Sequence, residues 1–344
     1  MNGLELSRRY YEEVGRPMLE AKFLDYMSRI AVGLVGEGSE CLGYDDEYSR
    51  DHDFGPGFCL WLTKEDYETI GAALQKAYEA LPGEFMGYPA RNESRRGGGR
   101  VGVQEISSYY RQFIGNEQPP QSLMRWLYLP EHKLAMAVNG EVFVDPLGEF
   151  TRIRELLQVY YPEDVRIKKI AARAAVMAQS GQYNYGRCMR RGDTVAAGMA
   201  LAEFVKAAVS MMYLLNKTYM PYYKWQFRGL KEMAAAKTAG MNAGNASTKS
   251  QMALSEVVEL LERLSRLGDQ SHAWEEPHPA GWNPYVNTLD RKVVIIEKIC
   301  GKVIEELKRQ GMTEGSEDFL EAHTWKIMSR IKDRELRSCH VMEG

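Results

Sequence analysis

The chain has 344 residues, which is longer than one hydrophobic core usually extends, so its length favours two domains. Hydrophobic residues make up 44% of the chain and charged residues 26%, as in an ordinary globular protein. The formal net charge of -3 excludes the long-range positive field of a general nucleic-acid binder. We therefore expect any phosphate ligand to be held by local groups.

The spacing of the cysteines and the length of the hydrophobic segments indicate the cellular compartment. Five cysteines are scattered without the close pairs of a zinc site or the dense framework of a secreted mini-domain. No run of about 18 uncharged apolar residues is present, and the N-terminal segment carries acids, so we expect neither export nor membrane insertion. These features predict a cytoplasmic protein.

The first half of the chain combines strand and helix patterns. Apolar residues at helical spacing predict one or two helices over residues 4–28, broken or kinked at Pro17. Short apolar runs predict strands at 30–35 and 58–62. Thr63, followed by an acid three residues later, predicts a helix over 64–81.

A loop and two further strands complete the first half. Residues 81–102 are rich in Gly, Pro and Arg and predict an exposed loop, after which a strand is expected at 100–106. Residues 107–137 look helical with interruptions at prolines, and residues 141–145 alternate as a strand that stops at Pro146.

From about residue 150 the strand signal disappears. Helical patterns cover 149–159, 163–180, 193–218, 222–236, 249–267, 286–310 and 315–336, with flexible connections expected at 237–250 and 268–287. The fold class is therefore predicted as α+β, with a domain of strands and helices over 1–150 and an all-helical bundle over 151–344.

One stretch near the N-terminus carries the most specific chemistry. Gly38 and Ser39 follow the first apolar run and can bring a phosphate close to backbone N–H groups. Asp51 and Asp53 precede the second run, and in a strand they would present two carboxylates to one face while His52 points away. Paired carboxylates suit Mg²⁺ bound to a nucleotide better than they suit zinc.

The order Gly38-Ser39, eleven intervening residues, Asp51-x-Asp53 resembles the signature of the polymerase-β-type nucleotidyltransferase superfamily. The helical second half resembles the arrangement of kanamycin nucleotidyltransferase. Together with segments 36–56, 140–149, 179–184 and 219–225, the chain looks like an uncharacterised bacterial subgroup of that superfamily. The resemblance spans most of the chain and implies a nucleotidyltransferase-like mixed β-sheet domain followed by an all-helical bundle.

The resemblance also implies roles for individual residues. Gly38 and Ser39 would hold the triphosphate, and Asp51 and Asp53 would bind magnesium. Many members supply a third carboxylate from a neighbouring strand. Asp145, which ends a predicted strand, is the first choice for this catalytic and metal-binding position, and Glu105 is the alternative.

Other polar residues allow more than one interpretation. Three arginines among glycines could close over phosphates or simply belong to an exposed loop; they are Arg95, Arg96 and Arg100. A break between helices could present polar groups to a ligand or use them for capping; these groups are Gln179, Tyr183, Asn184 and Arg187. Around Pro221, Lys224 is the candidate nucleotide contact, with aromatic core packing as the alternative for its neighbours.

The predicted function is a magnesium-dependent nucleotidyltransferase that moves a nucleoside monophosphate from a nucleoside triphosphate, ATP first, to a hydroxyl of a small molecule or protein. Glu105, Glu141 and Glu149 are candidate general bases because they lie near predicted strand ends. A catalytically inactive nucleotide sensor and a helical module that binds protein or RNA are the alternatives. The choice between monomer and homodimer stays open.

Overall fold

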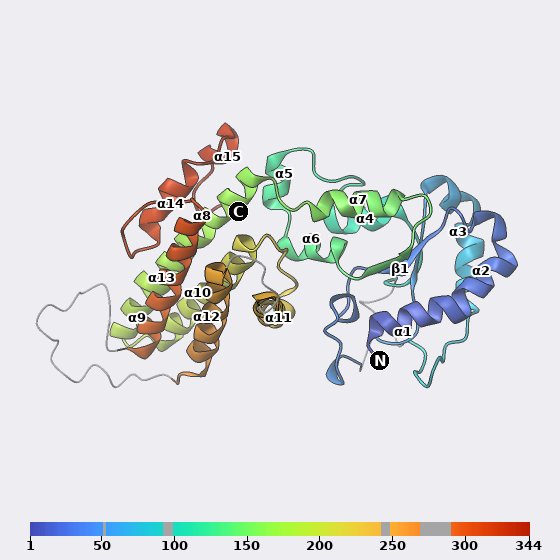
Figure 1. The fold of residues 1–344 in the computed structure, drawn as a ribbon, viewed down its shortest axis with the longest axis horizontal. Coiled ribbons are helices and arrows are strands. Elements are labelled where there is room, and N and C mark those ends of the chain that lie inside the picture. Colours follow the sequence, from blue (N-terminus) through green and yellow to red (C-terminus); the bar gives the residue numbers. More distant parts are fainter. Residues whose placement is uncertain (51–52, 92–98, 242–247, 269–289) are drawn as a thin grey trace, which may run out of the picture. The chain divides into compact units, whose positions relative to one another are not determined.

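The computed structural model describes residues 1–50, 53–91, 99–241, 248–268 and 290–344 and divides into two compact units (Figure 1). Unit 1 comprises Met1–Gln121 and Leu129–Tyr160, and unit 2 comprises Ser122–Tyr128 and Tyr161–Gly344. The division falls after Tyr160 rather than at residue 150, because helix α7 (Glu149–Gln158) packs on the sheet of unit 1. Helix α5 (Leu123–Tyr128), by contrast, belongs to unit 2.

Unit 1 is built on a four-stranded mixed sheet. Its strands are β1 (Ala31–Leu34), β2 (Cys59–Leu62), β3 (Gly102–Glu105) and β4 (Glu141–Val144), in the order β3-β2-β1-β4. Strand β1 pairs antiparallel with β2 and β4, whereas β2 and β3 are parallel. Each strand lies within the range expected from its apolar pattern, and the predicted α+β class is confirmed.

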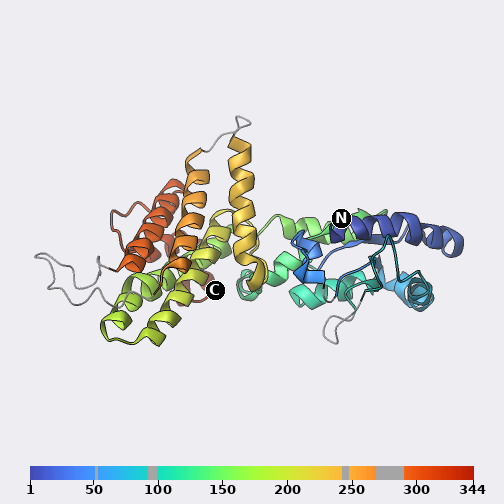
Figure 2. The same cartoon turned by 90° about the horizontal axis from the view of Figure 1, so that it is seen from below.

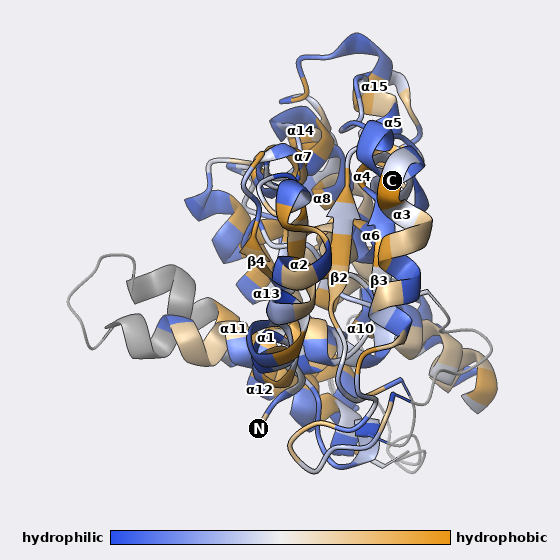
Figure 3. Cartoon of the chain, turned by 90° about the vertical axis from the view of Figure 1, so that its right-hand side faces the viewer, coloured by the Kyte–Doolittle hydropathy of each residue, from blue (hydrophilic) through white to orange (hydrophobic). Residues whose placement is uncertain are grey.

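One face of the sheet is covered by the N-terminal helices and by α3 (Lys64–Glu79). The N-terminal helices are α1 (Gly3–Tyr10), the π-helical turn η1 (Tyr11–Gly15) and α2 (Arg16–Lys22). Val32, Leu60 and Leu62 project from the strands into this core with no exposed surface. In Figure 3 the strands carry mainly hydrophobic colours, whereas the helices change colour from turn to turn. The helices therefore bury one face each against the strands.

The opposite face is covered by α4 (Ile106–Ile114), α6 (Glu131–Val138) and α7 (Figure 1). Trp61 points to this side because it alternates with Leu60 and Leu62 along β2. Its ring stacks on Phe150 of α7 at 3.9 Å between centroids and meets Tyr109 of α4 at 5.5 Å. Unit 1 is thus a sheet between two helical layers.

Pro17 does not break the first helix. The preceding turn η1 is π-helical, and the Arg16 N–H donates to Tyr11 O across five residues. Pro17 consequently lies at the start of α2, where its missing N–H is tolerated. Widening of the turn before the proline is the physical reason that the helical segments continue through it without a break.

The described part of unit 2 contains helices and no strand. Its long helices are α8 (Glu163–Met177), α10 (Thr194–Leu215), α11 (Gln226–Met241), α12 (Thr248–Arg266) and α13 (Arg291–Arg309) (Figure 2). The shorter ones are α5, α9 (Gly186–Arg190), α14 (Glu321–Met328) and α15 (Arg334–Ser338). The expected final helix over 315–336 is therefore divided, and both expected connections include residues outside the described ranges.

Helix α10 is long and apolar enough to cross a membrane by length and composition, with a mean hydropathy of 1.5 in its most apolar window. Within unit 2 it packs against α8 and the π-helical segment η5 (Ala178–Tyr185), and its buried residues include Phe204 and Met211. Such packing is that of the central helix of a bundle, which accounts for the apolar composition. A single helix of this kind is weak support for a membrane span.

Candidate functional site

The Gly-Ser turn follows β1 directly. Gly36 and Gly38 adopt φ values of 116° and 121°, a region that side chains other than glycine rarely enter. Ser39 then begins a short 3₁₀ turn, Glu40–Leu42. Within the described residues, the N–H groups of Gly38, Ser39 and Glu40 donate to no protein acceptor. Neighbouring open N–H groups in a turn form a concavity that suits an anion.

Asn139 holds this turn in place from the other side of β1. Its side chain accepts from Gly36 N at 2.8 Å and donates to Gly36 O at 2.8 Å. The next residue, Gly140, donates its N–H to Cys41 O at 2.7 Å, and Arg154 donates to the Asn139 carbonyl oxygen. The amide of Asn139 thus pairs with Gly36 as a neighbouring strand would, which fixes the backbone of the turn.

Asp53 lies before β2 rather than within it. The strand begins at Cys59, and Asp53 has φ of 54°, so the alternation argued for Asp51 and Asp53 is wrong for Asp53. The insertion of residues 54–58 between the acids and the strand is the reason. Asp53 is nonetheless buried, with 5% of its surface exposed. Asp51 and His52 lie outside the described residues.

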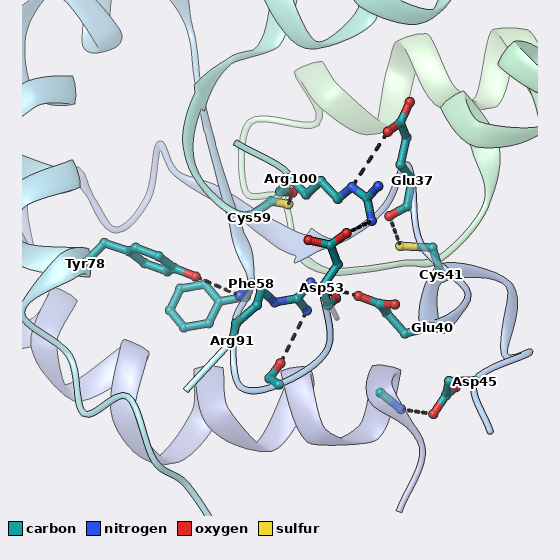
Figure 4. Close-up of polar contacts among 12 residues, drawn as sticks. Glu37, Glu40, Cys41, Asp45, Asp53, Phe58, Cys59, Tyr78, Arg91 and Arg100 are labelled. Atoms are coloured by element: carbon teal, nitrogen blue, oxygen red, sulfur yellow. Dashed lines mark hydrogen bonds and ion pairs between the residues drawn. The ribbon is translucent and has the colours of Figure 1, made fainter. Parts of the chain in front are cut away.

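Two arginines meet the acids of this loop (Figure 4). Arg91 donates to Glu40 Oε1 at 3.0 Å and to Asp53 O at 2.7 Å, and it is almost completely buried. Arg100 approaches Asp53 Oδ2 at 3.3 Å and Glu37 Oε2 at 3.7 Å. Arg91 therefore connects Glu40 to the backbone of the loop at Asp53, whereas Arg100 forms an ion pair with the side chain of Asp53.

Among the described residues, the ion pairs around the Gly-Ser turn and Asp53 join equal numbers of acids and cations. Lys133 of α6 lies 3.6 Å from Glu37 and is the third cation beside these acids, after Arg91 and Arg100. Three acids face three cations; they are Glu37, Glu40 and Asp53 against Arg91, Arg100 and Lys133. A nucleoside triphosphate that binds with a divalent cation brings both negative and positive charge. The arginines and the lysine can pair with the phosphates, and the carboxylates can pair with the cation.

The strand register excludes the expected third carboxylates from this place. Strand β1 ends beside the starts of β2, β3 and β4, because Leu34 pairs with Glu141 and Gly33 with Cys59. Asp145 follows the far end of β4, and Glu105 pairs with Leu62 at the far end of β2. Both acids lie at the opposite end of the sheet from Gly38 and Asp53. The assignment of Asp145 or Glu105 to a shared metal is therefore wrong.

Asp145 has a structural role instead. Its carboxylate accepts from Gly148 N at 3.1 Å and from Thr151 N at 2.8 Å, so it caps the first turn of α7. Glu105 likewise accepts from the Ser108 hydroxyl at 2.7 Å. Among the candidate bases, only Glu141 lies at the end of the sheet that carries the Gly-Ser turn, where it pairs with Arg8.

The donor chemistry of Asp53 fits a magnesium ion that a nucleotide helps to hold. Within residues 1–50, 53–91 and the later described ranges, no group of three His, Cys, Asp or Glu side chains is placed to hold a metal by itself. Mg²⁺ in nucleotide sites commonly takes one or two carboxylates and completes its shell with phosphates and water. Asp53 can supply one such carboxylate oxygen, and no all-protein cage is required.

Neither cysteine beside the loop is prepared to act as a nucleophile. Burial raises the pKa of the Cys59 thiol to about 12 and raises the pKa of the Cys41 thiol well above its ordinary value, with Glu40 adding to the effect at Cys41. Both thiols stay protonated near neutral pH, and the thiolate is the reactive form. The site therefore does not support cysteine-based covalent catalysis.

Lys224 belongs to unit 2. It follows the exposed residues Tyr222 and Tyr223, of which Tyr223 is 71% exposed, and its ammonium lies 5.2 Å from the Trp225 ring centroid. Core packing, the alternative for these aromatics, applies to Tyr219, which is buried against Tyr161. A nucleotide contact for Lys224 stays a prediction.

The expected break near residue 180 is a continuous π-helical segment, η5, that joins α8 to α9. Tyr183 and Asn184 are exposed on it, and Arg187 lies over the Tyr183 ring at 3.6 Å. Gln182, which was not singled out, is buried and contacts Glu297 and the backbone of Leu320. Local sequence could not distinguish this widened helix from an interruption, because the hydrogen-bond shift depends on packing.

Three contributors to the site had no recognisable sequence signal: Glu40, Arg91 and Asn139. Arg91 lies at the edge of the Gly- and Pro-rich loop and contacts residues about forty positions earlier. Asn139 resembles an ordinary Asn-Gly turn residue. Spacing along the chain carries no information about such long-range partners.

A protein-family profile described as a domain of unknown function (DUF4037) matches residues 126–226, which is less than half of the chain. The matched range contains Lys133, Asn139, Asp145 and Lys224, but not the loop from Gly36 to Asp53. Comparison with curated proteins and comparison with solved structures give no match. The activity is therefore inferred from the chemistry of the site.

Proposed function

We propose that unit 1 is a magnesium-dependent nucleotidyltransferase domain that binds a nucleoside triphosphate, with ATP as the first candidate. It transfers the nucleoside monophosphate to a hydroxyl of a small-molecule or protein acceptor, and pyrophosphate leaves. The acceptor hydroxyl attacks the α-phosphorus, its proton passes to a base, and the bond to the β-phosphate oxygen breaks.

The observation that carries this proposal is the juxtaposition at one end of the sheet. Open N–H groups at Gly38 and Ser39 lie in a turn held by Asn139, close to the loop that contains buried Asp53. The N–H groups suit phosphate oxygens, and Arg100 supplies a fork that matches them. Magnesium, held by Asp53 and Asp51, would neutralise charge on the phosphates.

Glu141 is the base candidate that the strand register favours. It begins β4 beside Leu34, at the end of the sheet from which the Gly-Ser turn emerges. Its side chain is about half exposed and pairs with Arg8, so the carboxylate remains accessible to an acceptor. Glu105 and Glu149 lie toward the other end, because Glu105 is the last residue of β3 and Glu149 follows the far end of β4.

The experiment supplies labelled ATP, UTP, CTP and GTP with magnesium to the purified chain and a pool of cell metabolites. Transfer of label to an acceptor that is lost in Asp53→Asn and retained in Asp145→Asn supports the proposal, because only Asp53 lies at the site end of the sheet. Loss of transfer in both variants to the same degree contradicts the placement of the site.

A nucleotide sensor without turnover is the second candidate. The observation in its favour is that Asp145 and Glu105 lie away from Asp53, so neither expected third carboxylate is there, and the described residues hold no group of three side chains placed to bind a metal. Magnesium-dependent binding of a nucleotide with no labelled acceptor and no pyrophosphate release favours the sensor over the transferase.

A further inference from the structure

Two arginines reach the same loop but have different surroundings. Arg91 is 7% exposed and donates to Glu40, to the Asp53 carbonyl and to Gly55 O at 3.3 Å, so its guanidinium is part of the interior. The Arg100 side chain is 26% exposed. Its distances of 3.3 and 3.7 Å to acids exceed the 2.7–2.9 Å or so typical of a charge-assisted hydrogen bond. Arg100 is the less firmly held cation of the two.

The backbone around Arg100 is fixed while its side chain is not. The Cys59 thiol donates to Arg100 O at 3.2 Å, and Gly102 N donates to Phe58 O at 2.9 Å. Gln104 donates from its side chain to Gly99 O at 2.8 Å. These bonds hold residues 99–102 against the start of β2. The guanidinium can therefore change partners by side-chain rotation without movement of the sheet.

Asp53 needs a positive partner for its charged form. It is 5% exposed, and a buried carboxylate without a nearby cation is strongly disfavoured. The side chain of Arg100 meets this need from 3.3 Å. A divalent cation bound to the same carboxylate also meets it, but the two positive groups repel each other at such distances. Arg100 and a metal ion are therefore competitors for Asp53.

We propose that Arg100 is an exchangeable cation that neutralises Asp53 until a metal-bound nucleoside triphosphate arrives, and that its guanidinium then moves to the phosphates. The proposal rests on the proposed function of the site. The metal alone binds weakly, because it must displace Arg100. The nucleotide offers Arg100 phosphate oxygens that match its fork, so metal and nucleotide bind with positive coupling.

The test measures Mn²⁺ binding by electron paramagnetic resonance of the free ion, with and without α,β-methylene-ATP, which cannot transfer its nucleotide. We compare the full chain with Arg100→Gln and with Lys133→Gln. Lys133 carries the same charge and lies 3.6 Å from Glu37, so it is the matched control. Thermal unfolding checks that each variant is folded.

In Arg100→Gln we expect Mn²⁺ alone to bind about tenfold more tightly, and the tightening produced by the nucleotide analogue to fall by about tenfold, within the usual range of coupling between sites. Lys133→Gln removes the same charge without releasing Asp53, so it should change the affinity for Mn²⁺ alone much less than Arg100→Gln does. Arg100→Lys keeps the charge and loses the fork, so it should bind Mn²⁺ alone as weakly as the parent chain while showing reduced coupling.

Equal affinity of the parent and Arg100→Gln for Mn²⁺ alone overturns the exchange. If nucleotide still tightens Mn²⁺ binding in that case and Asp53→Asn removes the effect, the proposed function stands without it. Absence of Mn²⁺-dependent nucleotide binding in the parent chain and in Arg100→Gln overturns the proposed function together with the exchange.

Discussion

The guanidinium of Arg91 donates to the carboxylate of Glu40 at 3.0 Å, and both side chains are at most 7% exposed. The same Arg91 nitrogen also donates to the carbonyl oxygen of Asp53 at 2.7 Å. One buried ion pair thus connects the turn after β1 to the residue expected to bind metal. The loop has a defined shape because its charges are paired internally, not because it is part of a strand.

Replacement of Arg91 by alanine should destabilise unit 1 by about 3–5 kcal/mol, since it leaves Glu40 buried without its cation. Arg16→Ala is the control: Arg16 lies 2.9 Å from Glu20, but that pair is exposed on α2, and its loss should cost about 1 kcal/mol or less. Urea unfolding measures both changes. Equal effects would show that burial of the Arg91 pair does not matter.

Asp145→Ala should lower stability by about 0.5–2 kcal/mol through loss of the cap on α7. Asp145→Asn retains an acceptor oxygen and should lose less. Neither change should alter Mn²⁺ or nucleotide affinity, because Asp145 follows the far end of β4. Calorimetric titration of both variants is the measurement. A large loss of metal affinity in Asp145→Asn, with stability intact, contradicts the capping role.

Asn139→Ala should destabilise unit 1 by about 1–3 kcal/mol, because the N–H and C=O of Gly36 lose their partners together. Asn139→Asp keeps the acceptor for Gly36 N but not the donor for Gly36 O, so an intermediate loss is expected. Nucleotide affinity should fall in parallel in both variants. Unchanged affinity despite lost stability would indicate that the turn does not bind the phosphates.

The stability of unit 2 should depend on pH through Glu297. Burial raises the pKa of this carboxyl above its ordinary value of 4.5, although Gln182 donates to it. The folded state therefore favours the protonated form of Glu297. The stability that this carboxyl contributes is fully present below pH 4.5, the ordinary pKa, and is lost as the pH rises through the higher pKa of the folded state.

Glu297→Gln removes this titration. The variant should melt at a higher temperature than the parent chain at pH 8, and the difference should shrink toward pH 4. Glu305, exposed on the same helix, gives the matched change Glu305→Gln. A difference in melting temperature for Glu297→Gln that stays constant from pH 4 to pH 8 contradicts the raised pKa.

Two glycines in helical segments should respond oppositely to alanine. A Cβ at Gly181 in η5 would overlap the fully buried ring of Phe204, so Gly181→Ala should cost about 1–3 kcal/mol through overpacking. At Gly198 in α10 a Cβ meets nothing within 4 Å, and Gly198→Ala should stabilise by about 0.5–1 kcal/mol. Urea unfolding separates the two, and a gain in stability at position 181 contradicts the close packing.

Local patterns along the chain determined much of the fold. The apolar runs at 30–35 and 58–62 contain β1 and β2 because buried strands need continuous hydrophobic residues, and Thr63 caps α3 as its hydroxyl predicts. The absence of strand patterns after residue 150 likewise agrees with the helices of unit 2. These signals depend on neighbours only a few residues apart, so they can be read without the tertiary structure.

Only the tertiary structure shows which acidic residues lie at the candidate site. Asp145 and Glu105 both end predicted strands, but only the strand directions and register show that they lie away from Gly38 and Asp53. Arg91 and Arg100, which both contact Asp53, come from a segment about forty residues later in the chain. The side chain of Asn139 bonds to Gly36, which lies 103 positions earlier. Contacts of this range arise from packing of the whole unit. The sequence determined the residue types of the site, and the fold determined their neighbours.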